Sequence, residues 1–278
     1  MAPRLPLELV EQIIDDVADN DIDKFSTIKA CALVCHCFLP LCRKYIFASV
    51  ILHTRWEGRI PTSANLNHLL SNSPHLAVFI RELDYRIDER EFVAEKFAWL
   101  LPMFKKLVKL QKLSIRYSPS GPHSVFGRML DWMSSSERKV LLPLLHLPTL
   151  TSISLSSIWN FPLADFASRV NLKKLRIRSL ECSTSNSVGK FLEALSPTPG
   201  PVMLERLTID AGSVKAVQQL CLARRPDGKP IIDFSSLKKI KSTDVELRSM
   251  TELFGMCRNL QKISLDSMSL PRLISSSI

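Results

Sequence analysis

The chain has 278 residues, of which 46% are apolar and 23% are charged, and its formal net charge is +10. This length and composition predict a folded protein with a sizeable core, and they exclude disordered and fibrous classes. No apolar run approaches the ~18 residues of a membrane span, and the first residues lack the apolar centre of a signal peptide. We therefore expect a location in the cytoplasm or the nucleus, with no membrane partner.

The first fifty or so residues predict short amphipathic helices. Pro6 suits the first turn of a helix, in which Leu9 and Ile13 recur one turn apart. Ser26 is a candidate N-cap for a second helix, and Pro40 suggests the start of a third. Helices this short cannot cover all of their apolar stripes among themselves, so part of that surface should face a partner or the next domain. Alternatively, they cap the following domain as the terminal units of repeat proteins do.

The order of residues in this segment resembles an F-box, the segment by which ubiquitin-ligase receptors bind a Skp-type adaptor. The pattern consists of Leu-Pro, Glu-Leu, isoleucines about one turn later, a Leu-Val-Cys step, and aromatic, Leu and basic positions. In this chain these residues are Leu5, Pro6, Glu8, Leu9, Ile13, Ile14, Leu33, Val34, Cys35, Phe38, Leu41, Arg43 and Phe47. The stretch is similar to the F-box-like proteins that are numerous in fungi. Where many members have Trp-Arg after the Cys, this chain has Phe38 and Leu39.

The resemblance implies a substrate receptor of a Skp–cullin–F-box ubiquitin ligase, with ubiquitin transfer performed by other subunits. Residues 1–52 would form the adaptor-binding segment, and residues 53–278 the substrate-binding domain. The implied adaptor-contact residues are Leu5, Pro6, Leu9, Ile13, Ile14, Leu33, Val34, Phe38 and Leu41. The alternative is a leucine-rich-repeat interaction scaffold without a role in a ligase.

From about residue 76 a short theme recurs: Leu or Ile, two residues, a second Leu or Ile, one residue, and a third apolar residue. Its copies are Ile80-Leu83-Tyr85, Leu110-Leu113-Ile115, Leu150-Ile153-Leu155, Leu172-Leu175-Ile177, Leu204-Leu207-Ile209, Leu237-Ile240 (third position polar) and Leu260-Ile263-Leu265. Amphipathic stretches between copies are long enough for helices, at Phe92–Val108, Val188–Leu195 and Val214–Leu222. We therefore predict an α/β fold: an irregular leucine-rich-repeat solenoid with parallel strands on the concave face and helices on the convex face. Because no polar cap follows the last copy, we expect either a truncated chain or a partner over the last strand.

Residues that flank the second and third apolar positions should point outward from each strand, toward the concave face. The cations at these positions are Lys112, Arg116, Lys174, Arg176, Arg178, Arg206, Lys239 and Lys241. Such a face suits an acidic or phosphorylated protein substrate, through charge-assisted hydrogen bonds. The alternative is a solvated charged surface without a ligand. Nucleic acid is less expected, because the outward positions carry almost no aromatic residues for base stacking.

The spacing of the cysteines and the absence of catalytic motifs favour a protein without a metal site and without catalytic activity. Cys31, Cys35, His36, Cys37 and Cys42 cluster in sequence, but Cys31 and Cys35 lie one helical turn apart within an apolar run and no second cluster follows. Buried thiols in a reducing compartment are the simpler interpretation. The chain also lacks a glycine-rich phosphate loop, a Gly-x-Ser-x-Gly elbow and a His-Glu-x-x-His helix. We expect a non-catalytic protein without a cofactor.

Overall fold

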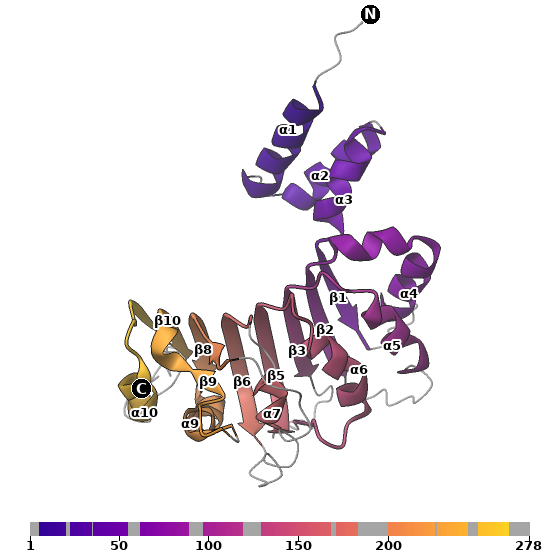
Figure 1. Ribbon diagram of the computed structural model, residues 1–278. Coiled ribbons are helices and arrows are strands. Elements are labelled where there is room, and N and C mark those ends of the chain that lie inside the picture. Colours follow the sequence, from indigo (N-terminus) through magenta and orange to yellow (C-terminus); the bar gives the residue numbers. More distant parts are fainter. Residues whose placement is uncertain are drawn as a thin grey trace, which may run out of the picture.

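The computed structural model describes residues 6–20, 23–34, 36–54, 62–88, 97–118, 129–167, 171–182, 200–225, 227–243 and 250–266 (Figure 1). Helices are α1 (Leu7–Asn20), α2 (Lys24–Val34), α3 (Phe38–Ile46), α4 (Thr62–Asn72), α5 (Phe97–Lys105), α6 (Ser136–Leu145), α7 (Ala164–Ala167), α9 (Val214–Leu222) and α10 (Thr251–Met256), with 3-10 turns η1 (Pro74–Phe79), η3 (Ala211–Ser213) and η4 (Phe234–Ser236). None of the helices in these ranges has the length and apolar character needed to cross a membrane.

The strands form an open sheet that follows the order of the chain. They are β1 (Ser49–His53), β2 (Glu82–Asp88), β3 (Lys112–Ser118), β4 (Leu130–Asp131), β5 (Ser152–Phe161), β6 (Lys174–Cys182), β7 (Val202–Met203), β8 (Arg206–Asp210), β9 (Ile232–Asp233), β10 (Lys239–Thr243) and β11 (Lys262–Asp266). Within the described ranges the sheet order is β1-β2-β3-β5-β6-β8-β10-β11, with β4 beside β5, while β7 and β9 pair separately. Every pairing between these strands is parallel. The predicted mixed α/β fold with a parallel, solenoid-like sheet is confirmed at this level.

The repeating theme sets the register of the sheet. The second apolar position of each copy pairs with that of the next, as in Leu83–Leu113 and Leu113–Ile153, and the same alignment continues to β11. Side chains alternate across a strand, so this register places all of the theme's apolar residues on one face of the sheet. On that face every theme residue from Ile80 to Ile240 is buried. The opposite face carries the polar flanking residues, and we call it the open face.

Helices cover the apolar face and complete the main core. Leu70 of α4, Phe104 of α5 and Leu144 of α6 are each at most 1% exposed. The ring of Phe104 packs edge-on against that of Tyr85 in β2, with 5.8 Å between ring centroids and an interplanar angle of 85°. The favourable free energy of burying a side chain of this size is about 1.5–3 kcal/mol, which explains why the amphipathic stretches between strands form helices here. Of those predicted, Val214–Leu222 is helical throughout, α5 lies within Phe92–Val108, and Val188–Leu195 lies outside the described residues.

A bend in β6 at Ser179 fixes the loop that follows β8. Ser179 has a φ of 45°, in the left-handed region that non-glycine residues rarely adopt. The Asp210 carboxylate stabilises this bend, because it accepts hydrogen bonds from the Ser179 backbone N–H at 2.9 Å and the Ser213 hydroxyl at 2.7 Å. Gly212 allows the two segments to approach, since a Cβ there would lie 3.2 Å from the Cα of Ser179.

The N-terminal helices form a separate unit with its own small core. Ile14, Ala18, Ile28 and Cys42 are buried together between α1, α2 and α3, and this cluster is distinct from the core of the sheet. In Figure 1 the three helices stand beyond the β1 end of the sheet. Strand β1 pairs with β2 and begins directly after this unit, so the predicted boundary at residue 52 falls inside β1.

The other end of the described sheet is less covered. Ile263 and Leu265 of β11 are 46% and 52% exposed, whereas the corresponding residues of the preceding strand, Ile240 and Ser242, are each 1% exposed. Residues 267–278 lie outside the described ranges. The structure therefore does not test the expectation of a partner over the last strand.

Candidate protein-interaction surfaces

An ion pair with a hydrogen bond ties the first and third helices together. The Asp15 carboxylate of α1 lies 2.6 Å from the Lys44 ammonium and accepts a hydrogen bond of 2.6 Å from the Tyr45 hydroxyl, both on α3. These two hydrogen bonds lower the pKa of Asp15, and the bond to Asp15 raises the pKa of Lys44. This ion pair and hydrogen bond, together with the small buried cluster, hold α1 against α3.

Several apolar side chains of this unit are exposed. Leu33 and Val34, at the end of α2, are 88% and 70% exposed, and Leu9 and Ile13 on α1 are 46% and 48% exposed. Leu7 adds further exposed apolar area, while Phe25 is 45% exposed on the side of the unit that faces the sheet. We call the remaining set the apolar helix surface: Leu7, Leu9, Ile13, Leu33 and Val34. Single exposed apolar residues are ordinary, but a group of this size on one small unit is typical of a protein contact.

The predicted adaptor residues separate into two groups. Exposed are Pro6, Leu9, Ile13, Leu33 and Val34; buried or half-buried are Ile14, Phe38 and Leu41; Leu5 lies outside the described residues. Ile14 is 1% exposed, so it holds the helices together and cannot reach a partner without a rearrangement. Phe38 and Leu41 pack partly against the same core.

The sequence prediction missed Leu7 and Phe25. Because Ser26 was expected to begin the second helix, Phe25 was placed outside it, whereas α2 begins at Lys24 and the Ser26 N–H bonds to the Asp23 carbonyl at 3.0 Å. The spacing of three residues between Phe25 and Ile28 is the signal that could have identified it as a helical residue.

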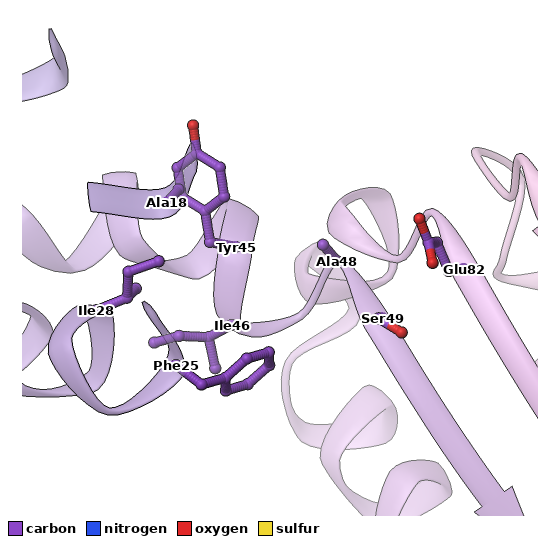
Figure 2. Close-up of a pocket in the computed structure, with 8 residues that line it drawn as sticks. All are labelled: Ala18, Phe25, Ile28, Tyr45, Ile46, Ala48, Ser49 and Glu82. Atoms are coloured by element: carbon purple, nitrogen blue, oxygen red, sulfur yellow. The ribbon is translucent and has the colours of Figure 1, made fainter. Parts of the chain in front are cut away.

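A cavity of about 220 Å³ lies where the helical unit meets the sheet. Figure 2 shows Phe25, Ile28 and Ile46 on its helical side, with Ala48, Ser49 and Glu82 on its strand side. The volume is smaller than the ~300 Å³ lower end of ligand pockets. The lining is mostly apolar and the cavity follows the connection between the two units, so we assign it to their junction and to no ligand.

The open face presents its polar side chains in straight rows, because all pairings share one register. The row at the start of the strands contains Ser49, Glu82, Lys112, Ser152, Lys174, Arg206, Lys239 and Lys262. The eight predicted substrate-contact residues Lys112, Arg116, Lys174, Arg176, Arg178, Arg206, Lys239 and Lys241 are all exposed on this face. The structure thus places these side chains outward on the open face, and their role in binding stays a prediction.

Ion pairs within the protein neutralise the cations at the β2–β3 end of the face. Lys112 pairs with Glu82, and the Asp84 carboxylate forms ion pairs with Arg86 at 2.9 Å and with Arg116 at 3.1 Å. At the other end Lys241 pairs with Asp266 at 2.6 Å. These cations already have acidic partners, so they are poorer candidates for binding a ligand than the sequence suggested.

A second group of cations has no acidic partner within the described ranges. It consists of Lys174, Arg176 and Arg178 on β6, Arg206 on β8, Lys239 on β10 and Lys262 on β11, and we call it the basic stripe. Neighbouring strands are ~4.8 Å apart, so Lys174, Arg206, Lys239 and Lys262 form a continuous row of positive charge. Between the paired cations of β2 and β3 and the basic stripe lie the neutral Ser152, Ser154 and Ser156 of β5.

The cysteines occupy different environments and do not gather. Cys42 is buried in the helical core, Cys31 is half-buried and Cys37 is exposed, while Cys35 lies outside the described residues. Burial raises the pKa of Cys182 and of Cys221 to about 12, so both thiols stay protonated near neutral pH. Across the ranges that the structure describes, no group of three or more His, Cys, Asp or Glu side chains could hold a metal ion.

Comparison of the chain with models of protein families gave no match, and a search of curated proteins gave none either. The functional argument therefore depends on the two surfaces themselves: an apolar one on the helical unit and a charged one on the open face of the sheet.

Proposed function

We propose that this chain is the non-catalytic substrate receptor of a Skp–cullin–F-box ubiquitin ligase. The helical unit would bind the Skp-type adaptor, and through it a cullin, and the open face of the sheet would bind a protein substrate. The sequence resemblance suggests this role, and the two surfaces are arranged in a way that supports it.

The observation that carries the proposal is the apolar helix surface. A helical unit of this size has little interior, since its buried cluster consists of Ile14, Ala18, Ile28 and Cys42. Yet Leu33 and Val34 are 88% and 70% exposed on the same unit. Covering a leucine or valine side chain of this kind contributes about 1.5–3 kcal/mol, so a protein partner would gain substantially from this surface.

The open face of the sheet suits the substrate-binding part of a receptor. The helices and strands behind it enclose one continuous apolar core, which makes this face a rigid platform. Such a platform presents a bound protein and supplies no chemistry of its own, and the ligase's other subunits would perform ubiquitin transfer.

The proposal is tested by co-expressing the full chain with a Skp-type adaptor and measuring co-elution in size-exclusion chromatography. Leu33→Asp is the sharpest variant, because a side chain that is 88% exposed contributes little to the fold. Leu222→Asp is the matched control: it makes the same chemical change at another exposed leucine, 63% accessible, on α9 of the repeat region.

We expect the wild type and Leu222→Asp to co-elute with the adaptor at equal stoichiometry and Leu33→Asp to elute alone. Retention of the complex by Leu33→Asp would refute the assigned surface. If the folded wild-type chain elutes alone, the receptor proposal fails and an interaction scaffold becomes the better description.

A further inference from the structure

We propose that the basic stripe binds an extended, acidic segment of a partner protein, rich in Asp and Glu. This inference rests on the proposed function, since it names the chemistry of the segment that the receptor would hold. The proposed binding surface is the half of the open face between β6 and β11, whereas the surface predicted from the sequence also included the cations of β3.

The electrostatics of the open face favour this half. At the β2–β3 end, Glu82 and Asp84 occupy the outward positions and pair with the neighbouring cations. An acidic ligand there would have to displace these carboxylates. From β6 onward the first row holds only cations, and no acidic partner for them lies in the described ranges. A carboxylate that reaches this row therefore gains charge-assisted hydrogen bonds without breaking existing pairs.

The dimensions of the row indicate an extended peptide. Four strands at a spacing of ~4.8 Å place Lys174 and Lys262 roughly 14 Å apart across the sheet. An extended chain advances ~3.3 Å per residue, so about five residues would cover the row. Arg176 and Arg178 extend the positive charge along β6 at one end of the row, where they would contact one end of the segment.

The narrowness of the stripe argues against a nucleic-acid duplex. On β8 and β11 the third outward position carries Asp210 and Asp266, so acidic groups flank the row of cations. A ligand wider than one row would place its phosphates near these carboxylates. A single strand is disfavoured as well, because the outward positions of β6, β8, β10 and β11 in the described ranges carry no aromatic residue on which an unpaired base could stack.

The experiment is fluorescence anisotropy with the full chain, without adaptor, and three labelled probes. The probes are a dodecapeptide of alternating Glu and Ala, the same peptide with phosphoserine in place of Glu, and a twelve-nucleotide oligothymidylate. The test variant is Arg206→Ala/Lys239→Ala. The control is Lys112→Ala/Arg116→Ala, which removes two cations from the same face where they are already paired. All four side chains are exposed, so both variants should fold, and circular dichroism checks this.

We expect the Glu-Ala peptide to bind the wild type and to lose about tenfold in affinity in the Arg206→Ala/Lys239→Ala variant, with less than about twofold loss in the control. A phosphoserine peptide that binds more tightly, with the same dependence on the stripe, would support the stripe as the binding site and overturn the assignment of Asp and Glu as its preferred groups. Equal losses in both variants, no binding of either peptide, or tighter binding of the oligothymidylate would each overturn the inference. Because no adaptor is present, failure here is distinguishable from failure of the receptor proposal.

Discussion

Ser242 of β10 is the position at which one stability prediction can be worked out in detail. It occupies the third apolar position of its repeat, where the paired strand β8 has Ile209. The residue is 1% exposed, and its hydroxyl has no hydrogen-bond partner among the described residues. A polar atom therefore lies in a row that every earlier copy of the theme fills with an apolar side chain.

The expected effect of replacing it is stabilising. A hydroxyl buried without a partner costs about 1–3 kcal/mol relative to its hydrated state in the unfolded chain. Ser242→Ala removes this hydroxyl and leaves the Cβ and the backbone unchanged. The substitution also removes the packing contacts of the hydroxyl oxygen, which offsets part of this gain. We therefore expect a net increase of about 1 kcal/mol in the free energy of unfolding.

Urea unfolding followed by circular dichroism measures this difference as a shift of the transition midpoint at constant slope. Ser264→Ala is the control, because Ser264 lies half-buried on the open face of the adjacent strand β11, and its replacement should change the stability by less than about 0.5 kcal/mol. A lower midpoint for Ser242→Ala than for the wild type would refute the argument, since it would mean that the hydroxyl stabilises the fold.

Three further predictions concern the core and the bend in β6. Phe104→Ala should cost about 3–5 kcal/mol in a urea titration, because it removes a ring that is 1% exposed and packs against Tyr85. Gly212→Ala should cost about 1–3 kcal/mol by the same assay, since its Cβ would lie 3.2 Å from the backbone of Ser179; unchanged stability would show that the loop adjusts freely. Burial raises the pKa of Glu137, so the folded state favours the protonated acid. The stability that this protonated carboxyl contributes is fully present below the ordinary glutamate pKa, and it is lost as the pH rises through the raised pKa. Glu137→Gln should therefore become more stable relative to the wild type as the pH rises from acid to neutral, and a constant difference between the two proteins would contradict this.

Most strands of the sheet were predictable, because the regular spacing of their apolar residues is visible in the sequence. The copies of the theme predicted β2, β3, β5, β6, β8, β10 and β11, since a strand with one buried face must alternate apolar and polar residues. Strand β1 was missed because Val50-Ile51-Leu52 is a continuous apolar run, in which alternation is invisible and helix and strand cannot be separated. Strands β4, β7 and β9 have two residues each, too few to show a period.

The sequence predicted an apolar side for each N-terminal helix, but it did not distinguish the residues of that side that are exposed from those that are buried. Ile13 and Ile14 are sequence neighbours about 100° apart around the axis of α1. Both fit an apolar stripe, yet Ile13 is 48% exposed and Ile14 is 1% exposed. The position of α1 relative to the other two helices decides between them. Packing of this kind depends on which residues of α2 and α3 face α1, and that information is spread over all three helices.

The division of the open face into paired and unpaired cations depends on register, which a single strand does not contain. Lys112 and Lys174 look equivalent in the sequence, since each follows two residues after the first leucine of its copy. They differ because Lys112 lies beside Glu82 of β2, while Lys174 has Ser152 and Arg206 as its neighbours. The first row of the sheet brings together residues that are 22 to 40 positions apart along the chain, so the acids that pair with Lys112 and Lys241 come from neighbouring repeats. Where a repeat supplies a serine or a second cation at that position, the positive charge stays available, and this is why we propose an acidic segment as the partner of the basic stripe.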